Sequence, residues 1–232
     1  MTKEISPHII SISGPSLSGK TELVKRMKDL GAIELVSHTT RPRRGNEVDG
    51  VHYNFVTLEE FEQLVKDGAM VQTSMHPEVN GHMYGMSAVE VNKQSLQNAP
   101  LLWVITPKSI PQIEQQIAKN ADWTLTKVLV FNEPEVLVER LLERFKNDSE
   151  SDNNNYAKRF LSLITKELPE WTTEQAQKNY DVVIKNFGAD NEKEVLYQLV
   201  SDNSRINPTH PQFCANAIEK IYHSASKKNK MK

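Results

Sequence analysis

Cysteine and long apolar segments are nearly absent from this chain of 232 residues. Cys214 is the only cysteine, which excludes an internal disulfide and a cysteine-based metal site and is usual in the reducing cytoplasm. No run approaches the roughly 18 consecutive apolar residues that a membrane helix needs, and residues 1–4 form no apolar signal segment. We therefore expect a cytoplasmic protein without a membrane partner.

An excess of charge of one sign is also missing. The formal net charge is −2, which gives the whole chain no electrostatic drive toward nucleic acid or a membrane. The basic stretch at residues 227–232 is typical of a solvated tail, so nucleic acid is not an expected partner. With 25% charged and 38% hydrophobic residues, the composition fits one globular α/β domain with an appendage, as a monomer or a dimer.

What the chain does contain is a phosphate-binding loop motif. Residues 14–21 read GPSLSGKT and fit the pattern G-x-x-x-x-G-K-[ST], between an expected buried strand at 9–13 and an expected helix at 21–30. In that setting backbone N–H groups turn inward around a phosphate at a helix N-terminus. Lys20 would reach the β- and γ-phosphates of ATP, and the Thr21 hydroxyl would ligate Mg²⁺. The expected ATP-binding residues of the loop are Gly14, Pro15, Ser16, Ser18, Gly19, Lys20 and Thr21.

The hydrophobic pattern beyond this loop predicts strands that alternate with helices. Further strands are expected at 32–36, 51–56, 70–75, 100–105, 125–131 and 180–185. Further helices are expected at 57–67, 87–97, 111–119, 134–145, 156–174 and 192–200, the first two of them with capping boxes. Such alternation indicates an α/β fold with a mostly parallel sheet covered on both faces. Residues 146–155 are all polar and are expected to form an exposed loop.

Two groups of arginines flank expected loops. Arg41, Arg43 and Arg44 follow the second strand, where they could grip a second phosphate bidentately. Arg140, Arg144 and Arg159 flank the polar loop, as in a lid that folds over phosphates. An isolated arginine would be interpreted as a surface charge, but two groups at these places supply the cations that phosphoryl transfer needs.

Four segments of the chain resemble the guanylate kinase family, in the same order and at close to the same spacing. They are residues 10–21, 37–45 (SHTTRPRRG), 47–55 (EVDGVHYNF) and Tyr84-Gly85. The resemblance is strong over 9–87, weaker but collinear to 186, and absent beyond. It implies a three-layer P-loop kinase fold with an inserted monophosphate-binding subdomain at about 36–90 and a lid at about 140–160. The expected domain covers 1–188, followed by a helical extension with a basic tail at 189–232.

The resemblance also implies residue roles and a reaction. Residues at the matching positions hold the GMP phosphate: Ser37, Arg41, Arg44, Tyr53 and Tyr84. Arg140, Arg144 and Arg159 match positions that serve the lid and the ATP phosphates, and the implied catalytic residues are Lys20, Arg41, Arg144 and Arg159. The implied reaction transfers the γ-phosphoryl group of ATP–Mg²⁺ to a nucleoside monophosphate, with GMP as the expected acceptor.

The chain departs from the family where the guanine base is recognised. Gln72 stands where the family has a glutamate, and its amide offers a guanine fewer acceptor atoms than a carboxylate does. Val104 and Thr106 stand in the places of a family Asp-x-Asp pair, and Met86 replaces the usual hydroxyl residue after Tyr-Gly. Gln72 and Thr106 are therefore the remaining candidates for acceptor binding, and Glu78 could supply a replacement carboxylate.

Several alternatives stay open at this point. A kinase of the same fold could use another phosphorylated acceptor, such as a ribose phosphate, which needs no guanine site. A binding module that has lost catalysis would explain the missing acidic residues, although the intact phosphate loop argues against it. A P-loop GTPase or ATPase switch is disfavoured, because the chain has no Asn-Lys-x-Asp motif and no acidic residue at the end of the strand at 100–105.

Overall fold

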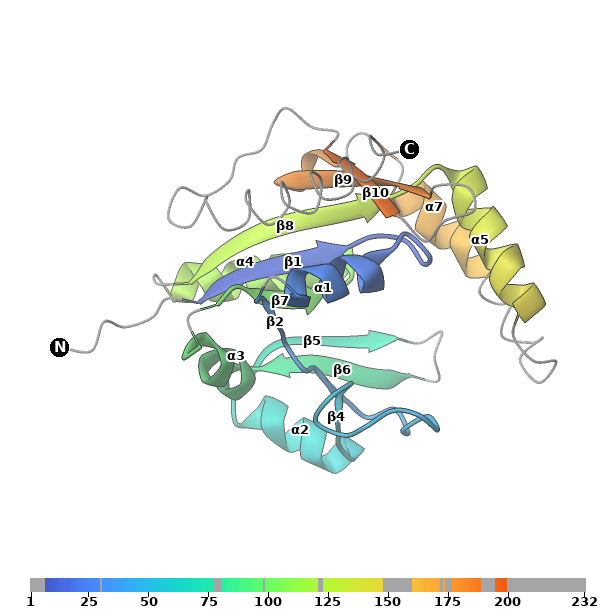
Figure 1. Ribbon diagram of the computed structural model, residues 1–232. Coiled ribbons are helices and arrows are strands. Elements are labelled where there is room, and N and C mark those ends of the chain that lie inside the picture. The colour runs from blue at the N-terminus through green and yellow to red at the C-terminus, as the bar shows by residue number, and fades with distance from the viewer. Residues whose placement is uncertain are drawn as a thin grey trace. The chain divides into compact units, whose positions relative to one another are not determined.

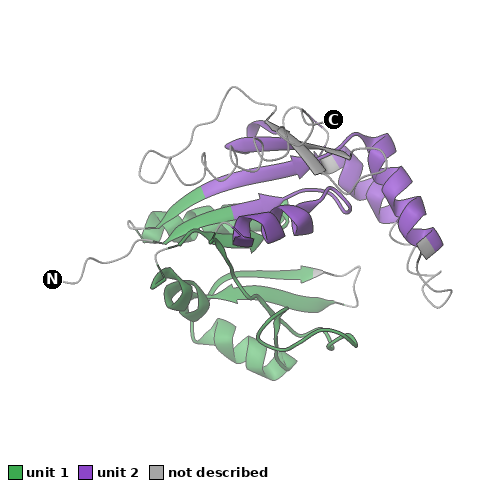
Figure 2. Ribbon diagram, viewed as in Figure 1, with its two compact units in different colours: residues 1–10, 31–125 green, residues 11–30, 126–232 purple. Residues whose placement is uncertain are grey.

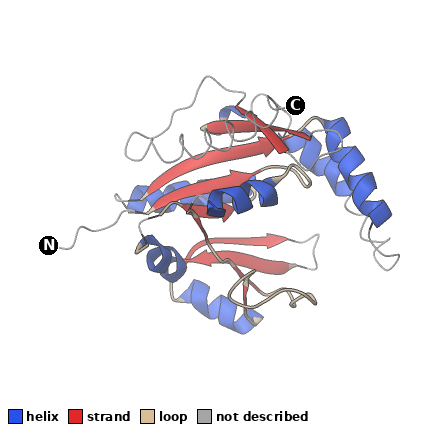
Figure 3. Cartoon of the chain, in the orientation of Figure 1, coloured by secondary structure: helices blue, strands red, loops and turns tan. Residues whose placement is uncertain are grey.

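The computed structural model describes residues 7–29, 31–76, 81–97, 99–120, 123–147, 160–171, 173, 177–188 and 195–199. Strands and helices alternate along these residues (Figure 3), which confirms the predicted α/β class. The strands are β1 (His8–Ser13), β2 (Ile33–Glu34), β3 (His38–Thr39), β4 (Asn54–Phe55), β5 (Met70–His76), β6 (His82–Ser87), β7 (Leu101–Val104), β8 (Thr124–Phe131), β9 (Val182–Gly188) and β10 (Val195–Leu199). The helices are α1 (Lys20–Asp29), α2 (Leu58–Lys66), α3 (Ala88–Ser95), α4 (Ile110–Lys119), α5 (Pro134–Asn147) and α7 (Leu168–Trp171), with a 3₁₀ turn η2 (Pro107–Ser109) and a π-helical turn η4 (Leu163–Glu167).

The larger sheet has the strand order β10-β9-β8-β1-β7-β2 among the described residues (Figure 1). β8 pairs with β9 and β2 with β7 in parallel, whereas β10 pairs with β9 antiparallel. All six residues of β1 are buried, its three isoleucines as well as its histidine and two serines, as in a strand covered on both faces. The mostly parallel sheet is therefore as predicted.

A second sheet with the order β4-β3-β6-β5 lies within the stretch expected to be the inserted subdomain. Its strands β5 and β6 run antiparallel from the Met70–Ser87 pair to the His76–His82 pair. A Cβ added to Gly85 on β6 would lie 3.0 Å from Cζ of Phe61, the buried residue of α2. Helix α2 therefore covers one face of this sheet.

The chain divides into two compact units (Figure 2). Unit 1 comprises residues 1–10 and 31–125, and unit 2 comprises residues 11–30 and 126–232. The phosphate-loop motif thus belongs to unit 2, whereas the whole second sheet belongs to unit 1. No helix in the described parts of either unit is long and apolar enough to cross a membrane.

Four local expectations differ from the structure. The second predicted capping box is incomplete, because the Ser87 hydroxyl accepts from the Glu90 N–H whereas the Glu90 carboxylate accepts from the Val36 N–H. The predicted helix at 192–200 is wrong, because residues 195–199 form β10, paired along its length with β9; tertiary pairing at the sheet edge overrides local helix propensity there. Strand β6 was not predicted. The expected strand at 51–56 shrinks to β4, because residues 48–53 turn back through backbone bonds from Gly50 to Tyr53 and from His52 to Val48.

The capping box of α2 is present as predicted, and it offers a direct stability test. The Thr57 hydroxyl accepts from the Glu60 N–H at 3.1 Å, and the Glu60 carboxylate accepts from the Thr57 N–H at 2.7 Å. We expect Thr57→Ala to lower the free energy of unfolding by about 1 kcal/mol, measured by urea denaturation. Thr57→Ser keeps the cap oxygen and is the matched control. A Thr57→Ala protein as stable as the parent would contradict this account of the helix start.

Candidate active site

The phosphate-loop motif of unit 2 forms a tight turn between β1 and α1. Gly14 and Gly19 have positive φ angles of 155° and 99°, which disfavour any residue with a side chain. A Cβ on Gly14 would also collide with the carbonyl oxygen of Val130 on β8. Glycine is thus required at Gly14 for two reasons, the backbone conformation and the close approach of the loop to the strand.

Lys20, the first residue of α1, points its ammonium back into the loop. Its Nζ donates to the carbonyl oxygens of Gly14 and Pro15, each at 2.8 Å. Burial lowers the pKa of Lys20 to about 8, and the nearby negative charge of Glu167 partly offsets that shift. Lys20 therefore places a cation beside the loop in a partly desolvated setting, where electrostatic interactions are stronger than in water.

Helix α5 and the π-helical turn η4 hold the outer side of the loop. Nη1 of Arg140 on α5 donates to the Leu17 carbonyl at 3.0 Å, and the Leu17 side chain packs against the buried cluster of Leu137, Leu141 and Leu163. The Glu167 carboxylate at the end of η4 accepts from the Ser16 N–H at 2.6 Å. The loop thus contains backbone donors, a buried cation and a helix N-terminus, the elements of an anion site.

The remaining candidates of unit 2 fall in different places. Ser18 is fully buried within the loop, and Thr21 is exposed in the first turn of α1. Arg144 is exposed on α5, one turn after Arg140. Arg159 lies outside the described residues. Among the residues that the structure does describe, no cluster of three or more His, Cys, Asp or Glu side chains could hold a metal ion.

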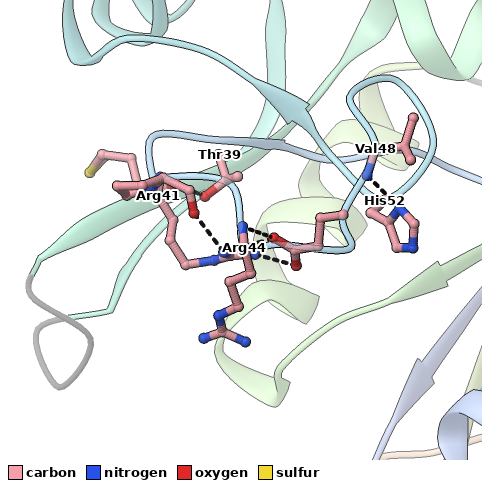
Figure 4. Close-up of polar contacts among 8 residues, drawn as sticks. Thr39, Arg41, Arg44, Val48 and His52 are labelled. Atoms are coloured by element: carbon pink, nitrogen blue, oxygen red, sulfur yellow. Dashed lines mark hydrogen bonds and ion pairs between the residues drawn. The ribbon is translucent and has the colours of Figure 1, made fainter.

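In unit 1 the arginine loop is organised around one ion pair (Figure 4). Arg41 is 7% exposed, and its Nη1 and Nη2 donate to the two Glu47 carboxylate oxygens at 3.0 Å and 2.7 Å. The same carboxylate accepts from the Arg44 backbone N–H at 2.8 Å. Bidentate pairing of this kind fixes the plane of a guanidinium, so Glu47 orients Arg41 and closes the turn that carries Arg44.

Aromatic rings surround the Arg41 guanidinium. Its carbon lies 5.5 Å from the Tyr53 ring centroid and 5.7 Å from that of Phe55, within cation–π range. The Tyr53 and Tyr84 rings meet edge to face at 5.9 Å. Hydrogen bonding to Glu47, with a smaller contribution from Tyr84, raises the pKa of Arg41, and burial raises the pKa of Tyr53. The structure thus brings Arg41, Tyr53 and Tyr84 together, as the sequence predicted.

The uncharged candidates form a separate polar group in the same unit. Nε2 of Gln72, on β5, donates to the Ser109 hydroxyl at 3.0 Å, and both residues are buried. The hydroxyls of Ser109 and Thr106, at the two ends of η2, lie 3.3 Å apart.

Ser37 lies apart from this group. It precedes β3 and is half-buried, and its carbonyl accepts from the Asn54 N–H at 2.9 Å.

Three residues of these sites escaped sequence reasoning. Glu47 belonged to a quoted motif, but the motif does not reveal its pairing with Arg41. Ser109 follows Thr106 by three residues, which is the spacing that a 3₁₀ turn brings together. Glu167 contacts Ser16 from 151 positions away and has no sequence signal. Glu78, the proposed replacement carboxylate, lies outside the described residues.

Comparison with known proteins finds relatives of one family. A family model described as guanylate kinase matches residues 6–203. Guanylate kinase of Legionella pneumophila (strain Lens) is 41% identical over 96 residues, which span 40% of this chain but only 44% of that protein. Guanylate kinase of Helicobacter pylori is 28% identical over 195 residues, 83% of this chain and 85% of that protein. A crystal structure of guanylate kinase from Anaplasma phagocytophilum matches with a TM-score of 0.51 and 21% identity, covering 80% of this chain and 79% of that one.

The features described above are those of a P-loop kinase type of protein. They are an α/β fold, a glycine-constrained phosphate loop and a second sheet that carries a second cationic site. The family model covers most of the length of this chain. The chain belongs to the guanylate kinase family. The match extends past residue 186, where the resemblance read from motifs ends.

The Arg41–Glu47 pair gives a pH prediction. Hydrogen bonding to Arg41 lowers the pKa of Glu47 from 4.5 to about 2. Because the folded-state pKa is depressed, the pair contributes stability above about pH 4.5 and loses it as the pH falls through about 2. We expect carboxyl-carbon NMR to show Glu47 titrating near pH 2, and Arg41→Ala to return its midpoint toward the ordinary value. A midpoint near 4.5 in the parent protein would contradict the pairing.

Proposed function

We propose that the protein is an ATP-dependent nucleoside monophosphate kinase that transfers the γ-phosphoryl group of ATP to GMP. The observation that carries the proposal is the presence of two separate phosphate-type sites, the glycine-constrained loop with Lys20 and the Arg41 cluster. Family membership supports the same reading. A protein with one phosphate to bind has no physical need for two such groups of cations and backbone donors.

The donor site would be formed by unit 2. Backbone N–H groups of residues 14–21 would hold the ATP phosphates, and Lys20 would contact the β- and γ-phosphates. Arg140 already fixes the loop through Leu17. Arg144 and Arg159 would supply lid cations that neutralise charge on the transferring group.

The acceptor site would be formed by unit 1. Arg41, Arg44, Tyr53 and Tyr84, together with Ser37, would hold the acceptor phosphate. Because Glu47 already fixes the Arg41 guanidinium, the site requires little rearrangement to meet a phosphate, and preorganisation of this kind favours transfer. Gln72 and Thr106 are the proposed contacts to the base.

Magnesium would arrive with the nucleotide. Mg²⁺ keeps several waters and binds through one or two protein groups together with substrate phosphates. The exposed Thr21 hydroxyl beside the loop and the absence of an acidic cluster in the described part of the chain fit an ion of that kind. Bound there, the ion would neutralise charge on the phosphates.

A second candidate is a guanylate-kinase-like binding module without catalysis. The uncharged side chains of Gln72, Val104 and Thr106 favour it, because they stand where the family has carboxylates. The described geometry of the phosphate loop favours the enzyme, because the loop keeps its glycines and its lysine. ATP turnover separates the two.

The cellular and domain assignments are part of the same proposal. We infer a cytoplasmic monomer or dimer that uses ATP and GMP, without nucleic acid or membrane partners. The kinase domain would comprise residues 1–188, with the monophosphate-binding insertion at about 36–90, the lid at about 140–160 and an extension at 189–232.

A coupled ADP-release assay with ATP–Mg²⁺ tests the proposal directly. The acceptors are GMP, dGMP, AMP, CMP, UMP, dTMP and ribose 1,5-bisphosphate. We expect turnover with GMP and dGMP, and its loss in a Lys20→Ala protein that still folds, because Lys20 acts on phosphates. Lys25→Ala, at an exposed position of α1, is the matched control. ADP release with ribose 1,5-bisphosphate alone would indicate a kinase with a different acceptor. No ADP release with any acceptor would favour the binding module.

The Glu167–Ser16 contact predicts a change in ATP affinity. The carboxylate occupies a loop N–H that the phosphates would use, and an ionised acceptor binds roughly twice as strongly as a neutral one. Glu167→Gln should therefore bind ATP more tightly, by several-fold in isothermal titration calorimetry. Glu139→Gln on α5 removes the same charge from an exposed position of unit 2 and should leave the affinity unchanged. Weaker ATP binding by Glu167→Gln would show that the carboxylate supports the loop instead of competing for it.

A further inference from the structure

A β-bulge in unit 1 determines where Gln72 points. Met70 pairs with Ser87, but the next pair is Gln72 with Met86, so Val71 is an extra residue on β5. With an uninterrupted register Gln72 would lie opposite Gly85, on the face that Phe61 covers. The bulge transfers Gln72 to the other face, since a shift of one residue reverses the direction of a side chain.

On that face Gln72 is a neighbour of the arginine–tyrosine cluster. Ser74, two residues further along β5, pairs with Tyr84, and Tyr84 also pairs with Thr39 on β3. Side chains two positions apart on one strand share a face, so Gln72 and Tyr84 are diagonal neighbours across the strand pair. Their backbones are then about 7–8 Å apart. A ligand whose phosphate contacts Tyr84 and Arg41 would extend its other end toward Gln72.

The Ser109 hydroxyl fixes the orientation of the Gln72 amide. Because Nε2 donates one of its two hydrogens to Ser109 at 3.0 Å in a buried setting, the amide is held with its NH₂ group toward Ser109, and the carbonyl Oε1 is its acceptor for a ligand. The hydroxyl oxygens of Ser109 and Thr106 lie 3.3 Å apart. One of the two hydroxyls donates to the other, so the pair retains one further O–H donor. The group therefore presents one neutral acceptor oxygen, one O–H donor and the second amide N–H.

The consequence for a guanine base follows from the number of its donors. N1–H and the exocyclic 2-amine lie side by side, and O6 is an acceptor. A carboxylate would take both donors on two charged oxygens, whereas Oε1 of Gln72 is one neutral oxygen. N1–H can use that oxygen and O6 can accept from the hydroxyl pair, while the 2-amine gains no charged partner from this group.

We propose that this group of Gln72, Ser109 and Thr106 recognises the O6/N1–H edge and not the 2-amine, so that the acceptor class is the 6-oxopurine monophosphates, IMP together with GMP. The inference rests on the proposed kinase function. Ser109 acts as a positioning residue, because it determines which atom of the Gln72 amide faces the base. The bulge at Val71 is the backbone feature that makes the contact available.

Steady-state kinetics with GMP and IMP test the proposal. We expect kcat/KM for IMP to be within about tenfold of that for GMP, the range of one neutral hydrogen bond. Gln72→Glu supplies a charged second oxygen and should shift the ratio toward GMP by at least about tenfold more. Gln112→Glu places the same charge nearby, on an exposed residue whose Oε1 accepts from the Thr73 N–H, and should leave the ratio unchanged.

Ser109→Ala provides a second readout. Without the hydroxyl the amide can turn its NH₂ outward, toward the N1 acceptor of adenine, so AMP turnover relative to GMP should rise. Ser109→Thr keeps the hydroxyl and should restore the parent ratio, whereas a merely structural role would lower both rates together.

The outcomes separate this inference from the proposed function. Turnover of GMP with IMP more than about tenfold poorer would overturn the inference, because a site that hydrogen-bonds the amine rejects the analogue that lacks it, by up to about 10⁴-fold or more, yet would leave the kinase assignment standing. A GMP:IMP ratio unchanged by Gln72→Glu would also overturn it. Absence of turnover with either nucleotide would overturn the proposed function itself and the inference with it.

Discussion

The close approach of the phosphate loop to strand β8 is the constraint on which the donor site depends. Only glycine fits at Gly14, because any Cβ would collide with the Val130 carbonyl oxygen. The chain leaves β1 at a positive φ angle and returns into α1, so the loop and the helix N-terminus face the same side, although Glu167 already accepts from the Ser16 N–H. Lys20 and Arg140 then attach to loop carbonyls, which fixes the loop from inside and from α5. Burial beside this loop lowers the pKa of Lys20, so the same packing that shapes the site also tunes its cation.

Unit 1 uses a charge pair for the same purpose. Glu47 holds both Nη atoms of Arg41 and the turn that carries Arg44, and aromatic rings lie against the guanidinium. A cation that is already oriented and partly desolvated interacts more strongly with an arriving phosphate than a solvated one does. We propose on these grounds that each unit contains a preorganised anion site of its own. Two such sites in one chain are what a phosphoryl transfer between two phosphorylated substrates requires.

Much of this could be predicted from the sequence where the determinants are local. The phosphate loop is a run of eight residues whose glycines and lysine carry the conformation, and the α2 capping box spans four. Strand β6 escaped prediction because Gly85 breaks its side-chain pattern and its partner β3 is distant in sequence. The helix expected at 192–200 failed because pairing with β9 decides the structure of residues 195–199. The contact of Glu167 with Ser16 arises only when η4 packs beside the loop, so no local pattern encodes it. The direction of the Gln72 side chain depends on a bulge, and the orientation of its amide depends on Ser109, which lies 37 positions away.

The central claim, that the two anion sites serve one transfer reaction, is tested most directly by the destination of the phosphoryl group. The protein would be incubated with γ-³²P-labelled ATP, Mg²⁺ and GMP, and the products separated by thin-layer chromatography. Our account predicts label in GDP at the rate of ADP formation and little label in inorganic phosphate, because the acceptor and not water receives the group. Label in inorganic phosphate at a rate that GMP does not change would contradict it, since that result would make the chain a nucleotide hydrolase whose second cationic site has no part in the reaction.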